Sequence, residues 1–402
     1  MKLDTTHLRY LSNEDWRVLT AVEMGSRNHE VVPTPLIAQI SGMRGGSGVQ
    51  RSISTLAKIG LIGKVKNAHY DGYRLTYGGV DYLALNTFSK RKTVYSVGNQ
   101  IGVGKESDIY VVAGETGVQH VLKIHRLGRI SFRSVKANRD YLRNRNSGSW
   151  MYMSRLAATK EFEFMKVLRE NGFPVPEPLD QSRHCILMEL IDAHPLRSVT
   201  EIVNPAKLYA ELMELIVKFA NHGLIHGDFN EFNILVYEKS QKPIVIDFPQ
   251  MISVDHANAE EQFDRDVNCI KRFFERKFGF KSDQPGPFFT KDVNTTKRLD
   301  AEVMASGFSK KQWKELEKYR LQVLANEKDD EGEEGESAEQ AVDENAEGDS
   351  EEEDDSEEEE EEEQLVQEEE EEEEEGEIIG TDKLGNAIYA KRGETTDKKA
   401  SK

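Results

Sequence analysis

The sequence predicts an α+β protein with two folded regions and a disordered acidic tail. Residues 1–90 hold three helix-like segments followed by a hairpin, and residues 93–325 begin with strand-like segments and continue with long helices. Residues 327–377 contain 33 Asp and Glu but one Lys, so the rest of the 402-residue chain carries a net charge of +12. Because such a charge run cannot bury enough apolar surface to fold, we expect residues 327–402 to be a disordered acidic tail.

Composition excludes several functional classes. No segment approaches the ~18 consecutive apolar residues of a membrane span, so we expect no membrane partner, and the first residues lack the apolar stretch of a secretory signal. The two cysteines, Cys185 and Cys269, favour a reducing compartment and exclude a disulfide framework or a cysteine-built zinc site. The whole-chain net charge of −20 argues against a nucleic-acid partner, but the basic remainder permits one.

The first region, residues 1–90, has the winged-helix pattern, in which three helices precede a β-hairpin. Asn13 is a candidate N-cap for the first helix, prolines open the second, and Gly60 ends the third. The helices are predicted at 13–24, 35–40 and 45–59, the hairpin strands at 61–65 and 73–75, and a closing amphipathic segment at 77–88.

A basic stretch lies on the predicted third helix and hairpin. It has no acidic residue and contains Arg44, Arg51, Lys58, Lys64 and Lys66. One interpretation is a surface that contacts a phosphate backbone such as that of RNA. The other is a solvated helix face in a winged helix that docks to protein, and the sequence leaves both open.

The second region changes from strands to helices. Residues 126–149 hold seven Arg and Lys and one Asp with little apolar periodicity, so we expect a mobile basic loop, or a helix that a partner such as RNA orders. This order predicts a small β-rich lobe at about 93–188 and a large α-rich lobe at about 192–325. Strands are predicted at 94–101, 109–113, 120–124 and 184–192, and helices at 154–171, 206–222, 258–278 and 309–325.

Two elements of the β-rich lobe carry candidate nucleotide-binding residues. The first is the turn over residues 102–107, which contains Gly102 and Gly104. Its backbone N–H groups can approach phosphate oxygens, and Lys105 and Ser107 can add contacts. Taken alone, such a turn is equally well an ordinary hairpin. The second element is Lys123, which lies on an apolar strand and therefore needs a carboxylate partner if its ammonium is buried.

The carboxylate partner of Lys123 is expected on the helix that follows. Glu161 and Glu163 are two positions apart, so they cannot share one helical face. Leu156 and Phe164 mark the buried side of this helix, and Glu161 lies nearer to it. We therefore favour Glu161 as the partner.

The segment His226-Gly227-Asp228-Phe229-Asn230-Glu231-Phe232-Asn233 carries the strongest signal. Asp228 and Asn233 are five positions apart, as in the catalytic loop of kinases, where Asp accepts the hydroxyl proton and Asn binds a metal. Asp247 follows another apolar strand, 14 residues after Asn233, and supplies a further oxygen ligand for Mg²⁺. These elements, in this order with the glycine turn and Lys123, predict a phosphotransferase site for ATP and Mg²⁺.

Four of these segments, GVGKESDIY, VLKIH, HGDFNEFNIL and IDFPQ, together resemble the RIO family of atypical protein kinases, in the branch that carries an N-terminal winged helix. The resemblance covers residues 1 to about 325. It implies a truncated, two-lobed protein-kinase-like domain at 93–325 and a non-specific serine/threonine protein kinase with ATPase activity.

The resemblance also implies a role for each matching residue. Lys123 contacts the α- and β-phosphates of ATP, Glu161 orients Lys123, and Lys105 and Ser107 lie in the phosphate loop. The hinge that binds adenine through its backbone is formed by Met188, Glu189 and Ile191. Asp228, with Lys123 and Asp247, forms the catalytic set, and Asn233 and Asp247 bind the metal.

The partner that the resemblance implies is a late precursor of the small (40S) ribosomal subunit, with its 18S rRNA precursor and assembly proteins. The implied localisation is cytoplasmic, with shuttling through the nucleus.

Departures from ordinary protein kinases favour ATP hydrolysis. The catalytic loop has Gly227 before its Asp, Pro249 stands in the position of the usual glycine, and no Ala-Pro-Glu motif follows, so no activation segment for docking peptides is recognisable. Asp247 is itself a candidate transient phosphoacceptor. Two alternatives remain: a small-molecule kinase of the aminoglycoside or choline type, and a non-catalytic assembly factor that binds ATP.

Overall fold

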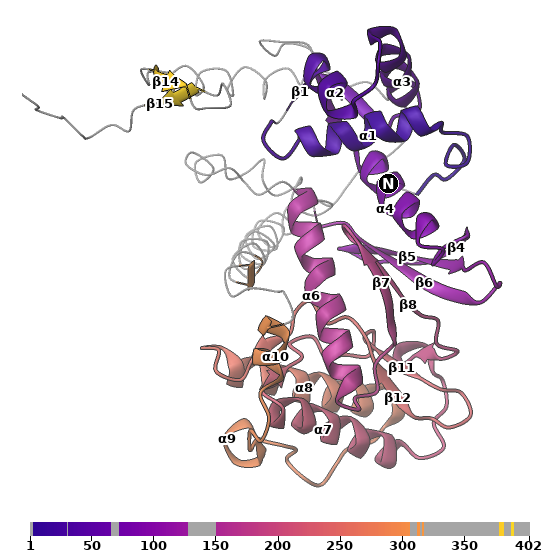
Figure 1. Cartoon of the computed structure of the whole chain (residues 1–402). Coiled ribbons are helices and arrows are strands. Elements are labelled where there is room, and N and C mark those ends of the chain that lie inside the picture. The colour runs from indigo at the N-terminus through magenta and orange to yellow at the C-terminus, as the bar shows by residue number, and fades with distance from the viewer. Residues whose placement is uncertain are drawn as a thin grey trace, which may run out of the picture. The chain divides into compact units, whose positions relative to one another are not determined.

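The computed structural model describes residues 3–29, 31–65, 72–127 and 150–305, together with residues 312–313, 316, 378–381 and 387–389. The chain divides into two compact units (Figure 1). Met1–Ser12 and Thr76–Ala341 form one, and Asn13–Leu75 and Val342–Lys402 form the other. None of the described helices combines the length and the hydrophobicity that crossing a membrane requires.

The Asn13–Leu75 segment has the predicted three helices and hairpin. The helices pack around Leu19, Ile37 and Ile53, all fully buried, and Gly42 ends the second helix in the left-handed conformation. A short first strand, absent from the prediction, extends the hairpin to an antiparallel sheet of order β1-β3-β2. The elements are α1 (Asn13–Gly25), β1 (Val32–Pro33), α2 (Thr34–Ser41), α3 (Gly46–Lys58), β2 (Ile62–Val65) and β3 (Gly72–Leu75).

The last part of the chain contains two short strands, β14 (Ile378–Thr381) and β15 (Ala387–Tyr389), which pair antiparallel. This pairing departs from the disorder predicted for residues 327–402. β-branched and aromatic residues on both sides of a Gly-Asn sequence favour such a hairpin. The acidic run itself, residues 327–377, lies outside the described residues.

The larger unit begins with the β-rich lobe. Its five-stranded sheet is antiparallel throughout, in the order β4-β5-β6-β8-β7. One face packs on α4, where Phe88 of the helix joins Leu122 and Ile124 of the sheet in a buried cluster. The elements are α4 (Tyr77–Lys90), β4 (Ser96–Val103), β5 (Ser107–Ala113), β6 (Gln119–His125), α6 (Trp150–Glu170), β7 (Pro178–Ser182) and β8 (Cys185–Glu189).

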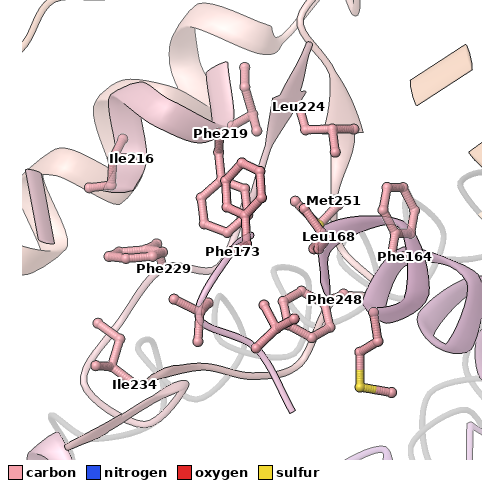
Figure 2. Packing of buried hydrophobic residues seen from close by; sticks show 14 of the residues in the cluster. Phe164, Leu168, Phe173, Ile216, Phe219, Leu224, Phe229, Ile234, Phe248 and Met251 are labelled. Carbon is pink, nitrogen blue, oxygen red and sulfur yellow. The ribbon is translucent and has the colours of Figure 1, made fainter. Parts of the chain in front are cut away.

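The α-rich lobe follows, as predicted. Its core is rich in aromatic rings, and Phe173 stacks on Phe219 with ring centroids 4.6 Å apart (Figure 2). The side chain of Asn204 caps the first long helix, which is α7. The elements are β9 (His194–Pro195), a short 3₁₀ helix (Leu196–Ser198), α7 (Pro205–Asn221), β10 (Leu224–Ile225), β11 (Ile234–Val236), β12 (Pro243–Val245), β13 (Ile252–Ser253), α8 (Ala259–Phe278), α9 (Phe289–Asp292) and α10 (Leu299–Ala305).

Three predicted features lie partly or wholly outside the described residues. Of the helix predicted at 309–325, only residues 312, 313 and 316 are described, and all three are helical. Of the basic loop predicted at 126–149, residues 128–149 lie outside the described part, and so does Lys66 of the predicted hairpin.

Arg126, the first residue of the predicted basic loop, corrects that prediction. It is 2% exposed, and its guanidinium binds both carboxylate oxygens of Asp81 on α4, at 2.9 and 2.7 Å. Its Nε also lies 3.3 Å from Asp108 on β5. A buried bidentate ion pair of this kind fixes the residue to the folded lobe, so Arg126 is no part of a mobile loop.

Candidate active site

Lys123 lies at the centre of the site and bridges the two lobes. It is 6% exposed on β6, and its Nζ donates to Glu161 Oε1 at 2.7 Å and to Asp247 Oδ1 at 2.9 Å. Glu161 on α6 is 1% exposed, whereas Glu163 on the same helix is half-buried. The glutamate that the amphipathic pattern favoured is therefore the one that binds Lys123.

The electrostatics keep Lys123 and Glu161 charged. Burial lowers the pKa of Lys123, but the carboxylates of Asp247 and Glu161 outweigh it and raise the pKa overall. Burial raises the pKa of Glu161, and the neighbouring charge of Lys123 outweighs it and lowers the pKa. The result is a buried ammonium that stays positive and can contact phosphate oxygens.

The glycine turn joins β4 to β5 next to this triad. The N–H of Gly104 donates to the carbonyl of Ser107 at 2.7 Å, which closes the turn. A Cβ on Gly102 would lie 3.3 Å from Ile109 Cγ1, so a side chain would crowd the strand pair. Lys105 is exposed and Ser107 half-buried, an arrangement that leaves the predicted phosphate-loop residues at one end of the sheet.

The predicted hinge continues from the end of β8. Met188 is 7% exposed and pairs with Val121. The N–H of Glu189 donates to the carbonyl of Glu177 at 2.9 Å, and the N–H of Glu177 donates to Glu189 Oε2 at 3.1 Å. Ile191 is half-buried, and its carbonyl accepts from Ala193 N–H at 2.9 Å. The connection between the lobes is therefore an ordered extended segment.

The catalytic loop holds Asp228 by two amide side chains. Asn230 Nδ2 donates to Asp228 Oδ1 at 2.9 Å, and Asn233 Nδ2 donates to Asp228 Oδ2 at 2.8 Å. Asn230 Oδ1 in turn accepts from the N–H of Phe232 at 3.0 Å. The carboxylate is thus fixed in orientation while its remaining lone pairs can accept a proton.

Asp266 of α8 also binds this loop, through two hydrogen bonds to its backbone. Its two carboxylate oxygens accept from the N–H groups of Gly227 and Phe229, both at 2.9 Å. Burial raises the pKa of Asp266 to about 7, although these two N–H groups lower it. His226 lies among the rings of Phe219, Phe229 and Phe248; burial lowers its pKa to about 4, so it is neutral at physiological pH.

Asp247 reaches the site through two paired strands. β11 pairs with β12, and the N–H of Ile246 donates to the carbonyl of Asn233 at 2.9 Å. Asn233 and Asp247 therefore lie at neighbouring strand ends. Asp247 itself has φ of +70°, a left-handed conformation that costs a non-glycine residue about 1–2 kcal/mol and often marks a functional site.

Lys160 of α6 fixes the segment that follows Asp247. It is 4% exposed, and its Nζ donates to the carbonyls of Pro249 at 2.8 Å and Met251 at 2.9 Å. The ring of Trp313 lies 4.4 Å away in a cation–π contact. Glu161 and Lys160, neighbours on one helix, thus bind Lys123 and the backbone that follows Asp247.

The oxygen atoms present fit Mg²⁺. Within the described part of the chain no group of three or more His, Cys, Asp or Glu side chains is arranged to hold a metal ion by itself, but Asp228, Asn233 and Asp247 supply two carboxylates and an amide. Mg²⁺ is typically held by one or two carboxylates and by the phosphates of a bound nucleotide. Asn233 and Asp247 would hold it here, and it would neutralise charge on the β- and γ-phosphates.

Sequence reasoning missed three residues that position this site: Lys160, Asn230 and Asp266. Lys160 and Asp266 lie on amphipathic helices, where a charge usually indicates a solvated face. Asn230 carried a signal, because an amide two residues after a catalytic Asp can bond back to it.

Comparisons with known proteins agree with this geometry. The RIO domain family model matches residues 108–285, and the Rio2 N-terminal family model matches residues 8–91. The serine/threonine-protein kinase rio2 of Schizosaccharomyces pombe is 62% identical over 320 residues, which cover 80% of this chain and 92% of the relative. The RIO2 kinase of Saccharomyces cerevisiae is 56% identical and is matched over 78% of its length and 77% of this chain.

A solved structure supports the same assignment. The crystal structure of the Rio2 kinase of Chaetomium thermophilum in an ADP/Mg²⁺-phosphoaspartate complex is 62% identical, with a TM-score of 0.74, over 81% of this chain and 99% of that chain. The buried pair of Lys123 and Glu161, the two family models and the match to 92% of the Schizosaccharomyces relative lead to one conclusion. The chain belongs to the Rio2 branch of the RIO family, and it is an ATP-binding serine/threonine-protein kinase.

Proposed function

We propose that this kinase binds a late precursor of the small ribosomal subunit and uses ATP turnover to promote maturation of 18S rRNA and its own release. The ribosomal partner is supported by the resemblance of the motifs to the RIO family. Its localisation, on this proposal, is cytoplasmic with passage through the nucleus. ATP turnover is supported by the site geometry, in which Lys123 contacts both Glu161 and Asp247.

Asp247 is the acceptor of the phosphoryl group in this proposal. One oxygen of its carboxylate attacks the γ-phosphorus of ATP, the bond from that phosphorus to the β–γ bridging oxygen breaks, and ADP leaves. Two observations support this role: the strained φ of +70° at Asp247 and the phosphoaspartate named for the Chaetomium relative.

Asp228 acts in the second half of the cycle. A water molecule attacks the phosphorus of the acyl phosphate, its proton passes to the Asp228 carboxylate, and the bond between phosphorus and the Asp247 oxygen breaks to release inorganic phosphate. The amides of Asn230 and Asn233, at 2.9 and 2.8 Å, support this role because they hold the carboxylate in one orientation.

RNA contact by the winged helix is part of the proposal. Arg44, Arg51, Lys58 and Lys64 are all exposed on or beside α3 and β2. An exposed cationic face of this kind is suited to phosphate groups. The segment 128–149, proposed as a second RNA contact, lies outside the described residues.

The test compares wild type and Asp228→Ala in ATPase, phosphoryl-transfer and release assays, with and without purified small-subunit precursors. We expect the precursors to stimulate wild-type turnover, and Asp228→Ala to bind ATP but remain on the particles. An Asp228→Ala protein that is released normally would identify a non-catalytic ATP-binding factor instead. Turnover on small alcohols without binding to particles would favour a small-molecule kinase.

A further inference from the structure

A group of cations surrounds a concave surface on the outer side of α8. Arg272, Arg276 and Lys277 line a cavity of about 380 Å³ together with Phe273, Cys269 and one acidic residue, Glu231. All three cations are exposed. The cavity wall is therefore strongly positive.

These cations have no carboxylate partners among the residues that the structure describes. Arg272 Nε donates to the carbonyl of Asn268 in its own helix at 3.3 Å, and Lys277 Nζ donates to the carbonyl of Arg197. None of the ion pairs formed by described side chains within 4.0 Å includes Arg272, Arg276 or Lys277. A cluster of cations that forms no ion pair within the described residues is suited to an acidic ligand.

The surface adjoins the catalytic loop. Arg197 adds a fourth cation, and its guanidinium lies 4.5 Å from the ring centroid of Phe232, which is 51% exposed. The N–H of Arg197 donates to the carbonyl of Glu231 at 3.0 Å. Because Glu231 is three residues after Asp228, their Cα atoms are at most about 11 Å apart.

We propose that Arg197, Arg272, Arg276 and Lys277 form a docking surface for acidic residues that flank an acceptor serine or threonine. The kinase therefore selects acidic polypeptide substrates. An extended chain advances about 3.3 Å per residue, so carboxylates three or four positions from an acceptor at Asp228 reach this surface. The sequence has no activation segment to dock a peptide, and this surface supplies the missing contact.

Phosphoryl transfer to the acceptor uses Asp228 and ATP. The acceptor hydroxyl attacks the γ-phosphorus, its proton passes to Asp228, and ADP leaves with the bridging oxygen. The inference goes beyond ATP turnover on a ribosomal particle, because it concerns transfer to a polypeptide. It requires no phosphorylation of Asp247.

The experiment uses the full chain and two synthetic peptides. The acidic peptide has the sequence AEGDSEEEDD, taken from residues 346–355 of this chain, and the neutral peptide carries Asn and Gln in place of each Asp and Glu. The test variant is Arg272→Glu/Arg276→Glu. The control variant is Lys207→Glu, which reverses the charge of an exposed lysine on α7.

We expect wild type and Lys207→Glu to prefer the acidic peptide by about tenfold in kcat/KM, the sum of several exposed ion pairs. The preference lies in KM and weakens at high salt. In Arg272→Glu/Arg276→Glu the ratio of kcat/KM for the acidic peptide to that for the neutral peptide falls to about one or below. ATP turnover without peptide is unchanged in this variant.

Three results would overturn the inference. The first is an undiminished acidic preference in the double variant. The second is normal ATP turnover by wild type with no transfer to either peptide, which would leave the proposed function standing. The third is a double variant that loses binding of single-stranded RNA but keeps its peptide preference, which would make the surface a nucleic-acid contact.

Discussion

Asp266 on α8 positions Asp228 through the backbone of the loop that carries it. Asp266 binds the N–H groups on either side of Asp228, so the position of the catalytic carboxylate depends on a group that does not touch the reaction. The sequence predicted Asp228 because its spacing to Asn233 is local. Asp266 lies far along the chain in α8, and only the fold brings it below the loop.

Asp266 should make turnover pH-dependent. With its pKa raised to about 7 by burial, it takes up a proton on acidification, and one of the two N–H groups then faces a hydroxyl. We expect the kcat of wild type to rise several-fold between pH 6 and pH 8. The kcat of Asp266→Asn should be about tenfold lower than that of wild type at pH 8 and should hardly change with pH, and KM for ATP should change little in either protein. A pH–rate profile of both proteins measures this, and identical profiles would contradict it.

The stability of the fold should change in the opposite direction. Because the pKa of Asp266 is raised in the folded state, its protonation favours folding: this contribution is present at low pH and is lost as pH rises through about 7. Denaturant titrations at pH 5 and pH 8 should therefore show a smaller loss of unfolding free energy in Asp266→Asn than in wild type. His226 contributes with the opposite sign, because its pKa is lowered from 6.5 to about 4 by burial and stability therefore rises with pH up to about 6.5. This contribution is the same in wild type and Asp266→Asn, so the difference between the two proteins reports Asp266.

Helix α6 links the catalytic lysine to the metal-ligand segment. Glu161 binds Lys123, and the adjacent Lys160 binds the carbonyls of Pro249 and Met251. Moving the helix away from the sheet would break the contact of Glu161, and moving it away from residues 249–251 would break those of Lys160. The amphipathic pattern identified Glu161, but a lysine beside it indicated only a solvated charge, because its carbonyl partners lie about ninety positions away.

Replacing Lys160 with Met should loosen this link. Two buried carbonyls lose their donor, so we expect the free energy of unfolding to fall by about 2–4 kcal/mol and kcat to fall with it. The matched control is Lys166→Met on the same helix, where the lysine is exposed and the expected change is within about 0.5 kcal/mol. Equal stability and turnover in the two variants would show that Lys160 is dispensable.

At the scale of the whole molecule, charge is separated along the chain. The net charge of −20 combines an acidic run over residues 327–377 with a basic remainder of +12. The order of the elements, the two lobes and most of the site residues followed from local patterns. Arg126 did not, since its basic neighbours suggested a loop. Its partners, Asp81 on α4 and Asp108 on β5, could be recognised only in the folded lobe.

The acidic run should weaken RNA binding by competing for the basic surfaces. Replacing residues 327–377 with a neutral Gly/Ser linker of equal length should raise RNA affinity several-fold at low salt and little at high salt, because salt screens the competing charges. Filter binding over a salt series measures this. Equal affinities at every salt concentration would show that the run acts as a solubility tail alone.

In the proposed cycle, Asp247 carries the phosphoryl group during ATP turnover. The most direct measurement is the chemical stability of the phosphate that wild type, Asp247→Ala and Asp228→Ala retain from ATP labelled at the γ-phosphate. We expect a hydroxylamine-labile phosphate on wild type, its accumulation in Asp228→Ala and its absence in Asp247→Ala. Phosphate that resists hydroxylamine, or that persists in Asp247→Ala, would contradict it.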